Sequence, residues 1–347
     1  TNPIRDFIPV SRITEMLEGP GEEFGYDGKR HTYPDARLIY WCGGNPFHHH
    51  QDLNRMIRAW QKPETIIVNE SWWNAMARHS DIVLPATTSL ERNDIGRSPE
   101  DTFIFPMQQA IPPVGDARSD YDIFTGIAQK MGVGESFTEG RSEDDWLRHL
   151  YGEFRKQMSR REGIEIPEFD DFWKLGEVEL PTEDNDRVHL SEFRSDPVKN
   201  PLKTPSGKIE IFSETIDSFG YEDCPGHATW LEPSEWLGAE RAERFPIHMI
   251  SNQPTTRLHS QHDPGSVSVA SKVQGREPVA VNPDDAMSRG IKDGDVVRVF
   301  NDRGECLAGV RVDEGVRPGV IVLSTGAWYD PETPGGLDRH GNPNDLT

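Results

Sequence analysis

Apolar runs alternate with helical patterns in the first quarter of the chain. Residues 38–42 form an aromatic-rich apolar run that stops at two glycines, and residues 53–60 then carry apolar side chains at helical spacing. Two further apolar runs, at residues 65–69 and 81–85, flank a second helical pattern at residues 72–80. This alternation predicts a βαβαβ unit with a parallel sheet, which binds ligands at the carboxyl ends of its strands.

The middle of the chain contains two strong helical patterns, followed by a stretch in which apolar residues show no regular spacing. Ser119 is predicted to cap one helix, and Ser142 and Asp145 resemble a capping box at the start of another. The acidic, proline-rich stretch that follows, residues 160–205, predicts a surface excursion or linker. Alternating apolar positions at residues 208–212 predict one more short strand.

Beyond residue 245 the pattern changes to short β-type runs separated by turn signals. One short helical segment, residues 284–288, interrupts them. Short strands at near-regular spacing predict a compact, mostly β domain, with a barrel as the expected form. The runs fall at residues 247–250, 279–281, 296–300, 305–312 and 320–323.

Length and composition then set the domain organisation. The 347 residues favour two to three domains, with 34% hydrophobic and 28% charged residues as in globular proteins. The predicted division is an α/β region at residues 1–160, an irregular linker or excursion at 161–243 and a β domain at 244–347. No run approaches the roughly 18 apolar residues of a membrane span. Because the chain starts at Thr1, we expect a processed or excised piece.

Charge and cysteine content exclude several classes of partner. The formal net charge of -22 disfavours nucleic acid, so an anionic ligand has to be held by local donors. The three cysteines are far apart and include no CxxC pair. The sequence therefore indicates neither a disulfide framework nor a zinc or iron–sulfur site.

The glycine turn after the first apolar run is the first candidate site. Gly43 and Gly44 allow backbone N–H groups to approach a phosphate-like anion, and Asn45, residues 48–50 and Gln51 add donors. Three consecutive histidines cannot all reach one ion, which disfavours a metal site. Cofactor contact and an exposed polar turn both stay open, since the full GxGxxG fingerprint is missing.

A second candidate is the donor-rich segment NQPTTRLHSQ, residues 252–261. Its amide, hydroxyl, guanidinium and imidazole groups suit phosphate or a polar heterocycle, although an ordinary polar loop is equally consistent. The chain has no nucleophile–base pair, paired-carboxylate motif, GxSxG elbow or Walker loop. The residues therefore predict a two-part binder of an anionic or nucleotide cofactor without its own catalytic set.

Long motifs closely resemble the molybdopterin oxidoreductases of the dimethyl sulfoxide reductase family: GGNPFHHHQDLNRMIRAWQKPETIIV, DIVLPATTSLERNDIG, NQPTTRLHSQ and GVRPGVIVLSTGAWYDP. Within the family they look most similar to the S- and N-oxide reductases, and nearest to the biotin or methionine sulfoxide type. The resemblance implies a Rossmann-like cofactor-binding domain followed by a double-psi-type β-barrel. It also implies one molybdenum held by two molybdopterin guanine dinucleotides, with oxygen-atom transfer to or from the metal.

The same resemblance implies the cofactor-binding residues. The glycine turn and strand ends would line one dinucleotide, Asp120 would pair with a guanine edge, and the donor-rich segment would hold the other half of the cofactor. No catalytic residue or metal ligand is assigned. The implied cofactor-binding residues are Gly43, Gly44, Asn45, His49, Gln51, Asn69, Asp120, Asn252, Arg257, His259, Ser260, Gln261 and Asn344.

Family members are considerably longer than this chain, so we expect it to be the C-terminal half. The metal ligand, a serine in this subgroup, would lie in the missing N-terminal half, and a last strand would follow Thr347. Expected partners are a small S- or N-oxide and an electron donor of unknown identity. Biotin sulfoxide-type members are cytoplasmic, and the dimethyl sulfoxide and trimethylamine N-oxide types are periplasmic. The alternative is a catalytically incomplete cofactor-binding fragment or a partner-binding module.

Overall fold

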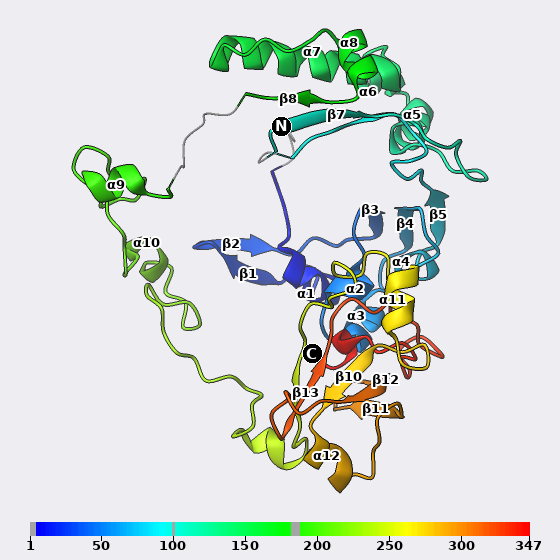
Figure 1. The fold of residues 1–347 in the computed structure, drawn as a ribbon, viewed down its shortest axis with the longest axis vertical. Helices are drawn as coiled ribbons and strands as arrows, with labels where there is room; N and C mark the ends of the chain where they lie inside the picture. The colour runs from blue at the N-terminus through cyan, green and yellow to red at the C-terminus, as the bar shows by residue number, and fades with distance from the viewer. Residues whose placement is uncertain (1–4, 99–100, 182–187) are drawn as a thin grey trace. The chain divides into compact units, whose positions relative to one another are not determined.

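The computed structural model describes residues 5–98, 101–181 and 188–347 (Figure 1). The chain forms two compact units, and both are discontinuous in sequence. The first unit contains Thr1–Ile67, Trp73–Ile82 and Glu210–Thr347, and the second contains Val68–Trp72 and Val83–Ile209. The glycine turn and the C-terminal β region therefore belong to the same unit. Within the described ranges, every helix is too short or too polar to span a bilayer.

The N-terminal part of the chain has the predicted alternation of strands and helices. A three-stranded parallel sheet has the order β3-β4-β5, and the predicted strands at 38–42, 65–69 and 81–85 are confirmed. An antiparallel hairpin, β1 with β2, precedes it. The elements are η1 (Val10–Arg12), α1 (Ile13–Glu18), β1 (Glu23–Tyr26), β2 (Lys29–Thr32), β3 (Leu38–Cys42), α2 (Pro46–His49), α3 (Leu53–Ala59), β4 (Thr65–Glu70), α4 (Ala75–Arg78) and β5 (Ile82–Pro85).

Side-chain caps explain where the helices around the glycine turn begin. Asn45 accepts a hydrogen bond from the backbone N–H of Phe47 at 3.0 Å, and Pro46 occupies the first helical position of α2. Asp52 caps α3 in the same way through the N–H of Arg55. The helix after the glycines is thus only four residues long, and a second helix carries the apolar side chains of the predicted pattern.

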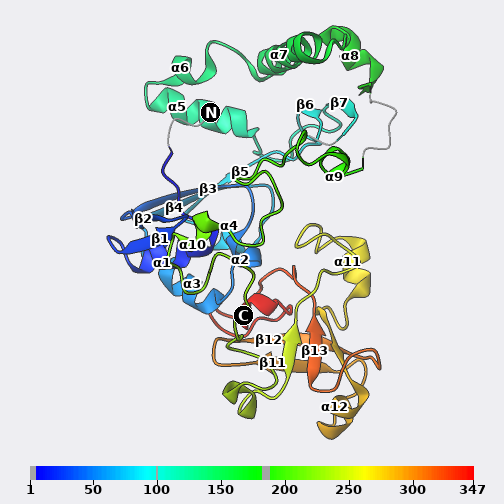
Figure 2. The ribbon, with the colours of Figure 1, turned by 90° about the vertical axis from the view of Figure 1, so that its left-hand side faces the viewer.

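The C-terminal part of the first unit is a five-stranded mixed sheet, drawn in yellow-green to red in Figures 1 and 2. Its order is β11-β12-β10-β13-β9, with β10 parallel to β12 and β13 parallel to β9. All five predicted strands are confirmed. The elements are α10 (Glu214–Asp217), η2 (Glu240–Glu243), β9 (His248–Ile250), α11 (Ser266–Ser271), β10 (Pro278–Val281), α12 (Pro283–Ser288), β11 (Val296–Phe300), β12 (Glu305–Val312), β13 (Val320–Leu323) and η3 (Pro343–Asp345).

Alternation along the strands builds the core of this sheet. Val279 and Val281 on β10 and Ala308 and Val310 on β12 are buried together with Leu323 of β13. Each pair is two residues apart, so its side chains point to the same side of the strand. The short helix α12 covers this core through Ala286, as the helical segment in the sequence predicts.

The second unit combines an antiparallel sheet, β6-β7-β8, with most of the long helices. The caps predicted at Ser119 and at Ser142 with Asp145 are both present. The sequence analysis predicted neither β6 nor β7 of this sheet. The elements are β6 (Asp94–Gly96), β7 (Phe103–Met107), α5 (Asp120–Lys130), α6 (Gly134–Thr138), α7 (Glu143–Glu162), α8 (Phe169–Leu175), β8 (Val178–Glu179) and α9 (Ser191–Ser195).

Two segments differ from the sequence predictions. Residues 164–180, within the predicted linker, pack into the second unit: the ring of Phe172 on α8 stacks on Tyr151 of α7 at 4.4 Å. The strand predicted at residues 208–212 is wrong, because this segment forms only an isolated bridge between Phe212 and His227. Alternation alone did not make a strand there, and Ile211 is 89% exposed.

Candidate cofactor-binding site

The glycine turn presents open backbone. Gly43 and Gly44 both have positive φ, 78° and 73°, and a Cβ added to either would meet nothing within 4 Å. The indole N–H of Trp41 donates to the carbonyl of Gly44 at 3.1 Å and fixes the turn. The backbone here is therefore accessible to a ligand, and a side chain would fill that space. The four-residue α2 offers only a weak helix dipole to such a ligand.

The three histidines after the turn occupy three different environments. His48 is buried and stacks on Trp328 with ring centroids 5.5 Å apart. Burial, with a smaller contribution from neighbouring His49, lowers the pKa of His48 to about 3. His49 is exposed, whereas His50 is buried. The run is thus not one cluster, and His48 is neutral at ordinary pH.

Buried polar atoms around the turn lack partners. Neither ring nitrogen of His48 has a hydrogen-bond partner among the described residues, and neither does the side-chain nitrogen of Asn45. Buried polar groups almost always find a partner, so orphaned atoms of this kind point to a missing ligand or water. The donor and acceptor capacity of an amide and an imidazole suits a polar heterocycle. His48 was not among the residues implied by the resemblance. The sequence does not show that His48 is buried while the neighbouring His49 is exposed.

The donor-rich loop, residues 252–261, follows β9 and is internally bonded. Asn252 accepts from the hydroxyl of Ser324 at 2.8 Å. His259 has a left-handed backbone with φ 51°, and its Nδ1 lies 3.1 Å from the side-chain nitrogen of Gln253. The side chains of His259 and Gln261 belong to exposed residues. The loop therefore offers imidazole and amide groups at its surface.

Arg257 behaves differently from the rest of the loop. Its Nε donates to the carbonyl of His259, its Nη1 to the hydroxyl of Ser268 and its Nη2 to the carbonyl of Thr325, at 3.0 to 3.2 Å. The guanidinium is buried and makes ion pairs with Asp263 and Glu277. The protein thus already uses all three nitrogens, and a direct role of Arg257 in cofactor binding stays a prediction.

Trp328 links the glycine turn to the donor-rich loop. It stacks on His48, and its indole N–H donates to the carbonyl of Ser260 at 2.8 Å. The tail adds a second link, because the side chain of Asn342 donates to the carbonyl of Phe47 at 3.1 Å. Asn342 also accepts from the N–H of the buried Asn344. The predicted turn, loop and tail residues are therefore joined within the first unit.

The remaining two predicted residues pair in the second unit. The amide of Asn69, at the end of β4, donates to Asp120 Oδ1 at 2.8 Å. Asp120 is the first residue of α5, next to its Ser119 cap. Asn69 thus lies at a strand end, as the strand pattern predicted, whereas no pattern in the sequence predicted that its amide would orient this carboxylate.

A small cavity of about 180 Å³ adjoins the tryptophan that joins turn and loop. Its walls combine aromatic rings with charged groups. The sequence analysis did not find it. The lining includes Trp73, Asn74, Arg78, Asp263, Trp328 and His340.

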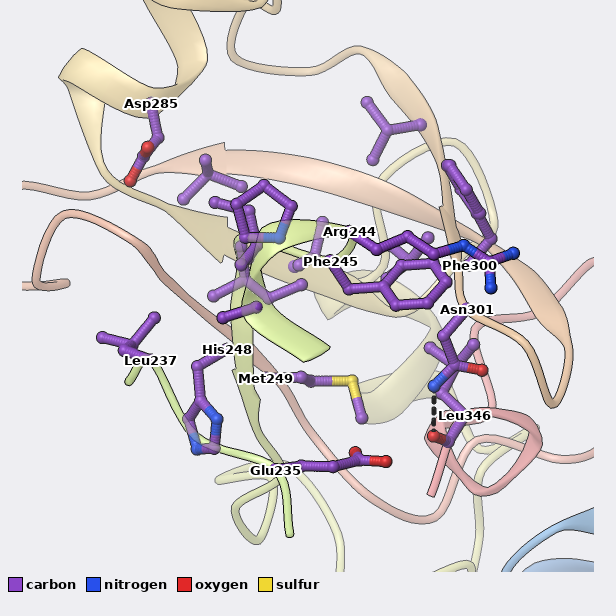
Figure 3. A pocket seen from close by; sticks show the side chains of 18 of the residues that line it. Glu235, Leu237, Arg244, Phe245, His248, Met249, Asp285, Phe300, Asn301 and Leu346 are labelled. Carbon is purple, nitrogen blue, oxygen red and sulfur yellow. Dashed lines mark hydrogen bonds between the residues drawn. The ribbon is translucent and has the colours of Figure 1, made fainter. Parts of the chain in front are cut away.

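A larger cavity of about 400 Å³ opens on the five-stranded sheet (Figure 3). Its lining is mostly apolar and includes Phe245, Met249 and Ile321, with Arg244 and Asp285 also among its residues. Strand residues that line it also belong to the sheet core. An apolar surface of this kind does not suit a phosphate, so we assign cofactor binding to the turn and loop instead.

Two family models match the chain. The model described as molybdopterin oxidoreductase covers residues 26–130, and the molydopterin dinucleotide binding domain covers residues 247–347. These two regions contain the glycine turn and the donor-rich loop. The open glycine backbone, the orphaned imidazole and the surface donors fit a group that combines phosphates with a polar heterocycle.

Known relatives agree with both models. The chain is 49% identical to a biotin sulfoxide reductase of Cereibacter sphaeroides, over 100% of this chain and 46% of the relative. It is 49% identical to a dimethyl sulfoxide/trimethylamine N-oxide reductase of Rhodobacter capsulatus and 44% identical to a trimethylamine-N-oxide reductase of Haemophilus influenzae. Each of these alignments covers 98% of this chain and 42% of the relative. The chain thus spans less than half the length of these relatives.

A solved structure supports the fold. The acetylene hydratase from Pelobacter acetylenicus superposes with a TM-score of 0.66 at 19% identity, over 90% of this chain and 41% of that one. At this identity the likeness concerns the fold alone. The sequence matches confirm the resemblance found in the motifs. The chain belongs to the molybdopterin oxidoreductase family.

Proposed function

We propose that this chain forms much of the cofactor-binding region of a molybdenum enzyme that reduces S-oxides or N-oxides. Candidate substrates are biotin or methionine sulfoxide, dimethyl sulfoxide and trimethylamine N-oxide. The observation that carries the proposal is the 49% identity, over nearly the whole chain, to relatives named for these reactions. The cofactor is molybdenum with two molybdopterin guanine dinucleotides, which when bound supplies two-electron oxygen-atom transfer.

The residues of this chain bind and orient that cofactor. Gly43 and Gly44 give it open backbone, and the neutral, buried His48 offers one ring N–H and one lone pair. His259 and Gln261 present donors from the loop. Further contacts are assigned to Asn45, His49, Gln51, Asn252, Ser260 and Asn344.

In the second unit, the pair of Asn69 and Asp120 would recognise the guanine edge. A carboxylate can accept from two adjacent N–H groups of that ring, and the Asn69 amide holds one of its oxygens in place. Asp120→Asn in the full-length protein would exchange one acceptor for a donor. The recognition would then favour a different purine.

The finer architecture belongs to the same proposal. We assign residues 1–160 to the α/β cofactor region, 161–243 to a connecting excursion of which residues 164–180 pack into the second unit, and 244–347 to a double-psi-type barrel. The missing N-terminal half would supply the serine ligand and the substrate channel. An S-oxide specificity of the biotin type would go with a cytoplasmic enzyme, and the other types with a periplasmic one.

Metal and pterin content of the full-length protein test the function directly. We expect material from a molybdate-replete bacterial host to contain molybdenum and to release fluorescent pterin. It should also oxidise a reduced viologen dye in the presence of a sulfoxide or N-oxide. The chain of residues 1–347 alone is the matched control for what the missing half contributes. If the full-length protein contained neither metal nor pterin, the result would support the alternative, in which this chain belongs to a catalytically incomplete protein or a partner-binding module.

A further inference from the structure

Four charged side chains form an enclosed cluster beneath the donor-rich loop, which we call the charge box. Its members are Arg257, Asp263, Lys272 and Glu277, and their side chains are 0 to 3% exposed. Lys272 Nζ lies 2.7 Å from Asp263 Oδ1 and 3.0 Å from Glu277 Oε2. Arg257 lies 3.4 Å from the same Asp263 oxygen and 3.1 Å from the same Glu277 oxygen. Two cations and two anions thus alternate around a closed ring.

Such a ring is an unusual way to build a protein interior. Removing charges from water is costly, and well-packed apolar residues of similar volume often stabilise a protein equally well or better. A buried, electrically neutral ring of this kind is therefore better explained by the segments that it positions than by the stability that it adds. The described contacts show two attachments from the ring to the loop.

The first attachment is direct. Arg257 donates to the carbonyl of His259 and to the carbonyl of Thr325, so it ties the loop to the segment after β13. The second runs through Asp263, whose Oδ2 accepts from the backbone N–H of Trp328 at 3.0 Å. The indole of Trp328 in turn holds the carbonyl of Ser260. Both attachments converge on residues 259 and 260.

The loop needs these attachments because its backbone is strained there. His259 has a φ of 51° and is not a glycine, a conformation that persists only where surrounding contacts enforce it. The contact is also tight, because a Cβ added to Gly326 would lie 2.0 Å from the His259 carbonyl oxygen. Lys272 does not contact the loop in any described bond and instead neutralises the two anions.

We infer that the charge box is a positioning device for the donor-rich loop, in which Arg257 acts through the backbone of residues 259–260 and is not itself a cofactor contact. Asp263 is a positioning residue that acts through Trp328. Lys272 and Glu277 balance the charge of the ring and have no positioning role. This inference rests on the proposed function for the identity of the ligand. Its mechanical part, an ordered loop, concerns the protein alone.

Two charge-neutral double variants of the full-length protein separate the roles. Arg257→Met with Glu277→Gln leaves the Lys272–Asp263 pair and removes the direct attachment. Lys272→Met with Glu277→Gln leaves Arg257 with Asp263 and keeps that attachment. Both variants lose one cation and one anion, so a general electrostatic penalty is the same in each.

The measurements are hydrogen exchange of cofactor-free protein and pterin retained by protein from a cofactor-making host. We expect the Arg257 variant to exchange faster at residues 257–263, with β10 and β12 still protected, and to retain about tenfold less pterin, as for partners that orient a ligand. The Lys272 variant should resemble the wild type in both.

Three outcomes would overturn the inference. Lower pterin retention with unchanged exchange in the Arg257 variant would make Arg257 a direct contact. Equal behaviour of the two variants would remove the special role of Arg257, and faster exchange throughout β10 and β12 would make the ring a general stabiliser. A wild type without pterin would refute the proposed function alone, because the exchange comparison needs no cofactor.

Discussion

The glycine turn and the donor-rich loop use glycine in opposite ways. Around Gly43 and Gly44 the space that a side chain would take is open, and nearby polar atoms have no described partner. At Gly326 that space is filled by the backbone of His259. All three guanidinium nitrogens of Arg257, within the loop, donate hydrogen bonds. The glycine turn thus leaves hydrogen-bonding groups available to a ligand. In the donor-rich loop, Arg257 instead donates to backbone carbonyls and so fixes the loop conformation.

The largest expected effect comes from Gly326→Ala. The new Cβ would overlap the His259 carbonyl and also require a left-handed alanine, so we expect a loss of about 3 kcal/mol or more of unfolding free energy. Gly44→Ala has open space and should cost only about 1 kcal/mol. Urea unfolding of the two variants makes the comparison. Equal losses would contradict the contrast between a crowded and an open glycine.

In Gly44→Ala, cofactor content should fall more than stability does. Gly44→Ala places a methyl group on the open side of the turn, so pterin retention should fall although the fold is nearly intact. A Gly44→Ala protein with full pterin content would remove the turn from the binding site.

The contrast between the two regions was only partly predictable from the sequence. Glycines after an apolar run predicted the open turn, because backbone conformation is a local property. The charge box was hidden, since Lys272 and Glu277 look like ordinary surface residues and charged side chains are rarely buried. Their enclosure depends on how β10, α11 and the segment after β13 meet.

The same limit explains the other differences. Residues 208–212 satisfy the alternation rule, but a strand also needs a partner, and pairing is a long-range property that a single segment does not specify. Conversely, α8 lies in an acidic stretch whose net charge concealed the buried Phe172. Helix caps at Ser119, Ser142 and Asp145 were predicted well because they depend on neighbours three residues away.

The pH dependence of stability should also distinguish the glycine turn from the donor-rich loop. His48 is buried, and burial lowers its pKa to about 3 although the charge of Asp263 acts in the opposite direction. Burial raises the pKa of Asp263, but Lys272, His340 and the backbone N–H of Trp328 together hold that pKa below the usual range. Both groups have depressed pKa values in the folded state, so each contributes stability that is lost as pH falls. The His48 loss begins near pH 6.5, and the Asp263 loss only below about pH 4.

Between pH 7.5 and 4.5 the turn should therefore lose stability, while Asp345, whose pKa burial raises to about 9, should gain stability over the same range. The two pH units below 6.5 correspond to about 3 kcal/mol for His48, with smaller shares from His49 and His50, whose pKa values burial also lowers. His48→Phe keeps a ring on Trp328 and should remove the His48 share of this loss in thermal unfolding. The free energy of unfolding of the variant relative to the wild type should therefore rise by about 3 kcal/mol between pH 7.5 and 4.5. An equal pH dependence in the two proteins would contradict the buried, neutral His48.

The smallest expected effect concerns two indole N–H groups, each of which donates to a backbone carbonyl, one in the glycine turn and one in the donor-rich loop. Trp41 donates to the Gly44 carbonyl at an exposed position, and Trp328 donates to the Ser260 carbonyl where both are partly buried. Water can replace the first donor but not readily the second. We therefore expect Trp41→Phe to cost less than about 0.5 kcal/mol and Trp328→Phe about 1 to 2 kcal/mol, which includes the lost indole volume. Denaturant midpoints at constant m-value measure both, and an equal cost would mean that the loop side is as open to water as the turn.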